Sequence, residues 1–190
     1  MTAPVRRRPY GVLDRDEVVD ALQNLARRVG VQRVTMRELA SELGASATSV
    51  YYHVPNKQAA LELLAESVLA EIPEPGPGSW DARLAELYCS ARQVILGVPG
   101  IAGVLQTHGG GERARRLSLL SHALIAEAGL GKATATPAHT VLYTYLLGSI
   151  SLSESRPPTV RPRSKRLEMA GFSAGVDVII AGIRASVEER

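Results

Sequence analysis

The chain has 190 residues, of which 45% are hydrophobic and 22% are charged, so it can bury a substantial core and is not intrinsically disordered. Its net charge of +3 lies entirely in residues 1–57, which carry nine basic and six acidic residues, because residues 58–190 carry thirteen of each. This asymmetry is expected if the N-terminal part meets an anionic polymer. A solvated surface with a chance imbalance of charge is the alternative.

Cys89 is the single cysteine, so an intrachain disulfide is impossible and a reducing, cytoplasmic location is expected. No apolar segment of the kind found in a signal peptide follows the basic N-terminus. We expect no membrane span, because no apolar run approaches the roughly 18–20 residues that cross a bilayer. The four histidines have no metal-site spacing with the cysteine, so we expect neither a metal nor a cofactor.

Four helices are predicted in the first 72 residues, each beginning at a residue that can cap a helix N-terminus. Gly30 and Gly44 are expected to end the first two helices, because glycine readily adopts the left-handed conformation found there. The fourth helix, 57–72, meets the segment P73-E-P-G-P-G-S79, whose prolines and glycines break the helical pattern. We therefore predict two domains, 1–72 and 73–190. The capping signals are Asp14 with Glu17, Thr35 with Glu38, Ser46, and Asn56.

The second domain also has a helical pattern throughout, so the predicted fold class is all-α. Thr136 is expected to cap a helix with Pro137 at its first position, which suits a residue without an amide hydrogen. The basic, proline-rich segment R156-P-P-T-V-R-P-R163 is predicted to be a loop. No strand alternation or internal repeat is evident. The predicted helices are 79–96, 101–107, 112–128, 136–155 and 165–187.

The two helices that flank Gly44 are too short to be stable alone, because an isolated helix needs about 12–15 residues. A short helix, a tight turn and a second short helix form the helix-turn-helix arrangement, whose second helix enters the DNA major groove. At 100° per residue, Ala47, Val50 and Val54 share one side of this second helix. We expect that side to pack inward.

The opposite side of the same helix carries hydroxyl and ring groups. Thr48 and Tyr52 point outward with no acidic residue beside them. Exposed aromatic rings need a partner, and tyrosine hydroxyls can donate hydrogen bonds to phosphate oxygens. Tyr51 either joins this face or packs against the helix 57–72. The face is therefore predicted to contact DNA.

Residues around this helix suit contacts with phosphate groups. Thr35 and Met36 lie at a helix N-terminus, where free amides attract phosphate, and Arg37 lies in the same turn. Lys57 begins the next helix in the same way. The basic arm Arg6-Arg7-Arg8 either reaches an adjacent minor groove or makes no specific contact.

The segment V34-T-M-R-E-L-A-S-E-L-G-A-S-A-T-S-V-Y-Y-H-V-P-N-K-Q-A-A-L-E-L-L64 resembles the N-terminal signature of TetR-family transcriptional regulators. The family pattern is matched at the turn L-A-x-x-L-G, at the cluster Y-Y-H and at the pair N-K. The C-terminal F172-S-A-G-V-D-V-I-I-A-G-I183 is similar to the last helix of members close to the tetracycline repressor. The resemblance and the capping analysis together give these candidate DNA-binding residues: Thr35, Met36, Arg37, Ser46, Ala47, Thr48, Ser49, Tyr51, Tyr52, His53 and Lys57.

The resemblance implies a homodimer that binds a palindromic double-stranded DNA operator, with two recognition helices about 34 Å apart. Base readout is implied at Ala47, Thr48 and Ser49. The tetracycline repressor uses longer polar side chains for this purpose, whereas Ala47 offers only a methyl group. We therefore expect weak base discrimination at that position.

The resemblance also implies that the second domain dimerises and senses a small-molecule effector. Helices 137–155 and 165–187 are the expected dimer interface, since their apolar residues exceed what one core face needs and Gly148, Ser149, Gly175 and Gly182 would permit close approach. The metal-chelating pattern of the tetracycline repressor is not reproduced, so tetracycline is not favoured. Each candidate ligand-binding residue could instead be a core tyrosine or a surface side chain. These candidates are Tyr88, Gln93, Gln106, His108, His122, Tyr143 and Tyr145.

The predicted function is a ligand-responsive transcriptional regulator, most simply a repressor. In the predicted mechanism the effector moves helix 101–107, which displaces helix 57–72 through the connection 73–79. The segment G-L-G-K132 resembles a phosphate-binding loop but lacks the upstream glycine and the Ser or Thr, so no enzyme is expected. The alternative is a small-molecule carrier or protein-interaction module that has lost DNA binding.

Overall fold

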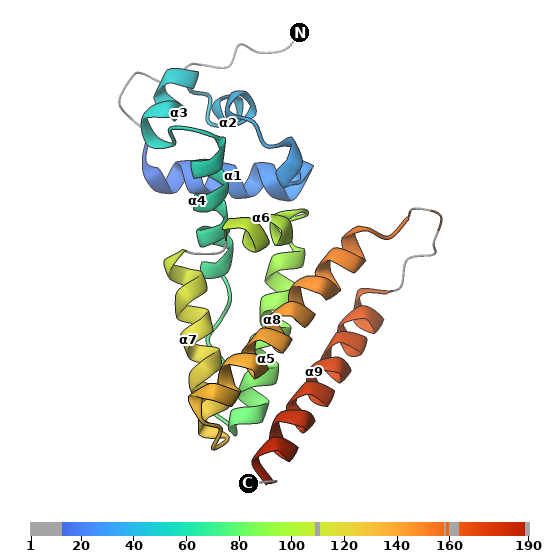
Figure 1. The fold of residues 1–190 in the computed structure, drawn as a ribbon. Coiled ribbons are helices and arrows are strands. Elements are labelled where there is room, and N and C mark those ends of the chain that lie inside the picture. Colours follow the sequence, from blue (N-terminus) through green and yellow to red (C-terminus); the bar gives the residue numbers. More distant parts are fainter. Residues whose placement is uncertain (1–12, 109–110, 158, 160–163, 189–190) are drawn as a thin grey trace.

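A computed structural model of the chain describes residues 13–108, 111–157, 159 and 164–188 (Figure 1). The secondary structure of these residues is entirely helical, which confirms the all-α prediction. The arm Arg6–Arg8 and most of the proline-rich segment lie outside the described residues. The elements are α1 (Arg15–Val29), the 3-10 turn η1 (Val31–Arg33), α2 (Met36–Glu42), α3 (Ala47–His53), α4 (Lys57–Ala70), α5 (Trp80–Leu96), α6 (Ile101–His108), α7 (Glu112–Glu127), α8 (Lys132–Glu154) and α9 (Lys165–Glu188).

The short helices begin where side chains replace the missing backbone partners of a helix N-terminus. The Ser46 hydroxyl accepts a hydrogen bond from the Ser49 amide at 3.1 Å, and the side-chain carbonyl of Asn56 accepts one from the Ala59 amide at 2.8 Å. Between α2 and α3, Gly44 has a φ of +60°, a conformation that costs glycine little. These local contacts confirm the predicted helix starts and the predicted turn.

The first four helices share a core in which Leu22, Leu39, Val50 and Leu64 are fully buried. α1 packs against α2, α3 and α4, and the two short helices also pack against each other. The prediction that Ala47 packs inward is wrong, because this residue is exposed. Ala47 is the first residue of α3, and the Cα–Cβ bond of a helical residue tilts toward the N-terminus, beyond the packed part of this helix.

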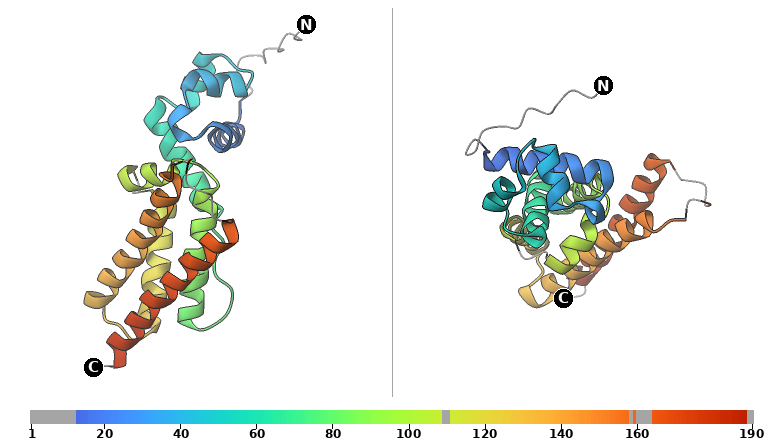
Figure 2. Two further views of the ribbon diagram at one scale, coloured as in Figure 1. Left: turned by 90° about the vertical axis from the view of Figure 1, so that its right-hand side faces the viewer. Right: turned by 90° about the horizontal axis from the view of Figure 1, so that it is seen from above.

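α4 runs from the first three helices into a bundle formed by α5, α7, α8 and α9, while α6 crosses the junction (Figures 1 and 2). Two further contacts join the parts. The Val31 amide donates to the Pro99 carbonyl at 2.9 Å, and Arg27 pairs with Glu71 at 2.5 Å. The end of α9 lies at the far end of the molecule from α1–α3. The boundary between residues 72 and 73 stays a prediction.

α8 begins five residues earlier than predicted. Gly131, not Thr136, is its N-cap, and Pro137 lies inside the helix. The proline removes the amide that would bond to the carbonyl four residues before it, but this position is close enough to the helix start for the helix to continue. The 3-10 turn η1 was also not predicted, because three residues carry too little periodicity to detect.

α9 differs from the expectation that no segment is long and apolar enough to span a membrane. Its segment Lys165–Val187 is long and apolar enough to span a bilayer by length and composition, although the sequence pattern indicated no such run. Only 22% of the corresponding window is buried within the protein. A helix that is both apolar and exposed needs another surface to cover it.

Candidate DNA-binding surface and effector cavity

The outer face of α3 is the most exposed aromatic surface among the described residues. Tyr52 is 88% exposed and its ring meets the His53 ring edge to face, with centroids 5.3 Å apart. Tyr51 is 49% exposed, so it also reaches solvent instead of packing fully against α4. Thr48 is exposed on the same side, while Val50 behind it is fully buried. α3 therefore presents hydroxyl and ring groups from a helix that is held in place by its buried side.

Several candidate DNA-binding side chains already have partners within the chain. The Ser46 and Ser49 hydroxyls lie 2.9 Å apart, so both belong to the cap of α3. The Thr35 hydroxyl accepts the Glu38 amide at 3.2 Å and donates to the Glu38 carboxylate at 3.0 Å. These contacts fix the N-termini of α2 and α3. Direct contact with DNA by the three hydroxyls would require sharing or exchange of these hydrogen bonds.

The positive charge of the surface comes from side chains beside α3. Arg37 is exposed in the first turn of α2, and Met36 next to it is partly buried against the core. Lys57 is exposed at the start of α4, and its Nζ lies 3.4 Å from the Gln32 carbonyl. This weak contact orients the lysine between α4 and η1. The sequence pattern had given Gln32 no role.

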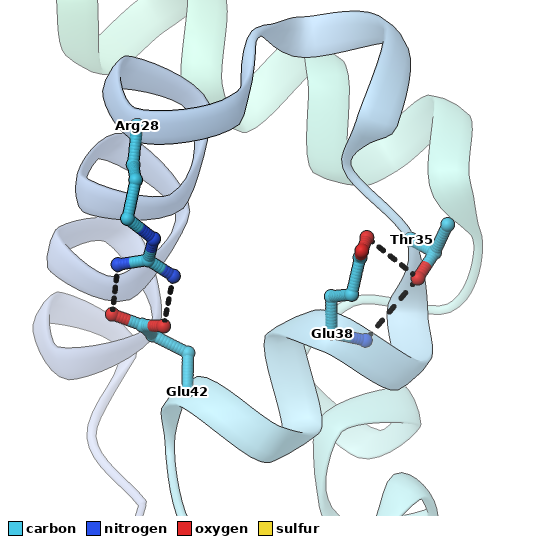
Figure 3. Close-up of polar contacts among 4 residues, drawn as sticks. All are labelled: Arg28, Thr35, Glu38 and Glu42. Atoms are coloured by element: carbon cyan, nitrogen blue, oxygen red, sulfur yellow. Dashed lines mark hydrogen bonds and ion pairs between the residues drawn. The ribbon is translucent and has the colours of Figure 1, made fainter.

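A solvent-accessible ion pair links α2 to α1. The two terminal guanidinium nitrogens of Arg28 donate to the Glu42 carboxylate, at 3.1 and 2.6 Å (Figure 3). Figure 3 also shows the Thr35–Glu38 cap at the opposite end of α2. The hydrogen bond from Arg28 lowers the pKa of Glu42, so the carboxylate stays ionised at neutral pH. α2 is therefore held at both ends, and α3 follows it through the Gly44 turn.

A cavity of about 250 Å³ lies inside the bundle, between α4, α5, α6, α7 and α8. Ten of its described lining residues are aliphatic, including Leu69 on α4 and Ile72 just after that helix. None of the described lining residues is Asp, Glu, Lys or Arg. The polar groups are five side chains from three helices: Tyr88, Ser118, Ser121, His139 and Tyr143.

These polar side chains form one hydrogen-bonded cluster. The Tyr88 hydroxyl lies 3.1 Å from both the Ser121 hydroxyl and His139 Nδ1, and His139 Nδ1 lies 3.0 Å from Ser121. His139 Nε2 lies 3.2 Å from the Ser118 hydroxyl. The Tyr143 ring stacks at a centroid distance of 6.1 Å from His139, and its hydroxyl donates to the Leu105 carbonyl on α6 at 3.5 Å. The polar part of an otherwise apolar lining is therefore one connected group of side chains.

Burial keeps this cluster uncharged. It lowers the pKa of His139 from its ordinary value of 6.5 to about 4, with a smaller contribution from the neighbouring charge of His122. Burial also raises the pKa of the Tyr88 and Tyr143 hydroxyls. At neutral pH the cluster consequently offers neutral donors and acceptors to a ligand.

The cavity contains two of the seven predicted ligand-binding residues, Tyr88 and Tyr143. Gln93 and Gln106 are exposed, because they lie on faces of α5 and α6 that point away from the cavity. Tyr145 stacks on Phe172 of α9 with ring centroids 5.0 Å apart.

The two remaining candidates are histidines. His122 contacts His139 from outside the lining, with ring centroids 4.4 Å apart, and the side chain of His108 lies outside the described residues. The sequence pattern did not single out Ser118, Ser121 and His139. The spacing of three residues between Ser118 and Ser121 on α7 was the one available signal, and His139 lies on a different helix, α8.

Two family models match the chain. Residues 18–66 match the model for bacterial regulatory proteins of the tetR family, and residues 72–171 match that of the tetracyclin repressor-like C-terminal domain. The chain belongs to the TetR family. The predicted membership of this family is thereby confirmed, and the match to the tetracyclin repressor-like domain confirms the predicted likeness to tetracycline repressors.

Individual relatives agree with this assignment. An HTH-type transcriptional regulator of Saccharopolyspora erythraea is 35% identical over 144 residues, which are 74% of this TetR-family chain and 61% of that protein. The chain thus spans less than two thirds of that relative's length.

Solved structures share the fold. A variant of TetR from Acinetobacter baumannii AYE, in complex with minocycline, has a TM-score of 0.78 at 26% identity, covering 92% of this chain and 98% of that one. BioQ with its natural double-stranded DNA operator has a TM-score of 0.76 at 22% identity, covering 91% of this chain and 99% of that one. At this lower identity the likeness to BioQ shows the fold alone.

Proposed function

We propose that this TetR-family chain is a transcriptional repressor that binds an operator as a homodimer and releases it when a small molecule fills the cavity. The observation that carries the proposal is the outer face of α3, where Tyr52 is 88% exposed on a helix capped at one end and buried on its other side. The Saccharopolyspora erythraea relative, named as an HTH-type transcriptional regulator, and the minocycline-bound TetR variant support the two halves of the proposal. We propose a cytoplasmic location and no enzymatic activity, in keeping with relatives named as regulators.

The DNA contacts follow from the arrangement of α2, α3 and α4. Thr48 and Tyr52 face the groove, where a methyl group and a ring edge can contact thymine methyls and the hydroxyls can donate to phosphate. Arg37 and Lys57 flank them and neutralise phosphate charge. Ala47 is exposed beside them and offers a methyl contact. In this proposal residues 1–72 form the DNA-binding domain.

The remaining residues, 73–190, would form the effector and dimer domain. α9 carries an exposed stripe of apolar and small residues at alternating spacings of four and three, the pattern of a helix that packs against another helix. Val178 is 72% exposed and Leu167 is 64% exposed in this stripe, and Leu152 on α8 is 75% exposed. The stripe consists of Leu167, Gly171, Ala174, Val178, Ala181 and Ala185.

Some residues that the sequence assigned to the dimer interface have partners within the protomer. A side chain on Gly175 would overlap Tyr145, so this glycine makes room inside the protomer. Ser149 accepts a hydrogen bond from the buried Arg92 at 3.2 Å. Gly148 and Gly182 have open space around them and remain candidates for close approach to a second copy.

The cavity can act on the DNA-binding helices through α4. Leu69 on α4 and Ile72 just after it line the cavity, and the same helix carries Lys57 at its other end. A ligand that fits only after these side chains move would bind one orientation of α4 more tightly than another. The operator affinity then changes by that difference in binding free energy. This route replaces the predicted relay through the 73–79 connection with a direct contact.

The DNA-binding half of the proposal is tested by anisotropy titration of labelled DNA from upstream of the chain's own gene. Specific, saturable binding is expected, with a slope of log K against log salt of about −4 if Arg37 and Lys57 of both protomers each neutralise one phosphate. A slope near zero, or equal binding to unrelated DNA of the same composition, would contradict the proposal.

The dimer is tested by Val178→Asp, which places a charge in the centre of the exposed stripe on α9. Light scattering should then report the mass of one chain instead of two, and the operator affinity should fall because each protomer can contact only one half-site. Leu119→Asp is the matched control, since Leu119 is 59% exposed on α7 and lies outside the stripe. A dimeric Val178→Asp protein would contradict the interface.

A further inference from the structure

The cavity limits the chemistry of its ligand in three ways. Its volume of about 250 Å³ is below the usual range for drug-sized ligands. Scaling from a cavity of about 150 Å³ that holds benzene gives a ligand on the order of ten non-hydrogen atoms. Aliphatic side chains form most of the lining, and its polar side chains gather in one cluster.

A charged ligand would find no counter-ion among the described lining residues. Burying an ammonium group there would be costly, because the cluster offers only neutral oxygen and nitrogen atoms. A carboxylate would find no positive charge there at neutral pH, because His139, whose pKa is about 4, is neutral. A neutral hydroxyl, in contrast, can donate to a spare lone pair of Tyr88, Ser118 or Ser121 and accept from one of their hydrogens.

We propose that the effector is an uncharged molecule about the size of two fused rings, with an apolar body and one hydroxyl group that binds the Tyr88–Ser121–His139 cluster. This inference rests on the proposed effector function of the cavity. It makes the charge of the ligand, and not only its size, the main basis of selection.

Four probes that share the naphthalene ring system and differ in their substituent test the proposal by calorimetry at pH 7.5. They are 1-naphthol, naphthalene, 1-naphthoate and 1-naphthylmethylammonium. We expect 1-naphthol to bind most tightly. Tyr88→Phe should weaken 1-naphthol roughly three- to tenfold, the effect of one hydrogen bond, and leave naphthalene unchanged. Tighter binding of either charged probe, or no binding of 1-naphthol, would overturn the proposal.

Ala91→Leu locates the binding site, because Ala91 lines the cavity on α5 and the larger side chain fills part of it. It should abolish 1-naphthol binding, whereas Ala82→Leu on the exposed face of α5 should not. Operator binding is measured in parallel without any probe. If the protein binds the operator but not 1-naphthol, only the proposed class of ligand is contradicted. If it does not bind the operator, the proposed function is contradicted.

A second, independent observation concerns the start of α7. Its N-cap is Gly111, which has no side chain to accept the free amides. Glu66 of α4 supplies the acceptor instead, since its carboxylate accepts the Arg113 amide at 3.0 and 3.3 Å. A Cβ on Gly111 would overlap the Glu66 carboxylate. α4 therefore caps α7 with a side chain from a different helix, which also complements the positive end of the α7 dipole.

The geometry points to Glu66 as a positioning residue that ties the DNA-bearing helix α4 to the cavity wall on α7. About one and two turns beyond the cap, Ala114 and Leu117 of α7 line the cavity. On α4, Leu69 lines it one turn after Glu66. The cap thus holds together the two helices between which a ligand would insert, and it fixes the direction in which α4 leaves the bundle.

Glu66→Ala and the double variant Glu66→Ala/Gly111→Ser separate this role from simple helix stabilisation. Serine at an N-cap position can cap α7 from its own chain segment, so the double variant should restore α7 without restoring the link to α4. Hydrogen exchange of the amides in α4 and α7 measures both helices. We expect faster exchange in both helices for Glu66→Ala, and recovery of α7 alone in the double variant. Recovery of both helices, or of neither, would overturn the inference.

Discussion

The α3 surface and the effector cavity are built over very different distances along the chain. The residues that flank and cap α3 lie between Gln32 and Lys57. The capping hydrogen bonds there join residues three positions apart, and the longest-range contact, from Lys57 to Gln32, spans 25 positions. The cavity instead brings together Leu69, Tyr88 and His139 from separate helices. A local surface can change without loss of the core, whereas the cavity is part of the core. Substitutions in the two regions should therefore have different consequences for stability.

The largest effect is expected from Val50→Asp, on the buried side of α3. An unpaired charge at this position should destabilise the DNA-binding helices by several kcal/mol and abolish operator binding. Thr48→Asp, on the exposed side, should also abolish operator binding by charge repulsion but change the unfolding free energy by less than about 0.5 kcal/mol. Thermal unfolding and operator anisotropy measure both. Equal stability of the two variants would contradict the assigned orientation of α3.

The burial of His139 beside the cavity should make the stability of the protein depend on pH. His139 is neutral in the folded protein down to about pH 4, but in the unfolded chain it gains a proton near pH 6.5. Its contribution to stability is therefore fully present above pH 6.5, falls as the pH drops from 6.5 to 4, and changes no further below that.

His139→Gln removes this titration and keeps a polar side chain. Chemical unfolding between pH 4 and pH 7.5 should show that the stability difference between parent and variant shrinks as the pH falls. The same difference at every pH would mean that His139 is not buried as a neutral group.

This contrast also explains which features the sequence could predict. Helix starts at Ser46 and Asn56 and the turn at Gly44 depend on residues within a few positions, so capping signals located them. The cavity lining depends on the order and rotation of α5, α7 and α8, which no local pattern specifies. Tyr88 was found because it is an aromatic residue at the apolar spacing of its helix. Ser118, Ser121 and His139 gain their role only from one another.

A small effect is expected from Arg28→Ala, which removes the ion pair to Glu42. Because both side chains are solvent-accessible, the loss of stability should be about 0.2–1 kcal/mol and should diminish at high salt. Operator affinity should change less than it does for any α3 variant. Urea unfolding at 0.05 and 0.5 M salt tests this; a loss of several kcal/mol would mean that the pair, and not the apolar core, positions α2.

The central claim is that the exposed face of α3, with Lys57 beside it, holds the operator. The double variant Tyr52→Ala/Lys57→Ala tests it most directly, because both side chains are exposed and neither belongs to the core. Operator titration by anisotropy should show affinity reduced on the order of 100-fold, with a shallower salt dependence and an unchanged unfolding temperature. A folded double variant that binds the operator as tightly as the parent would contradict the account.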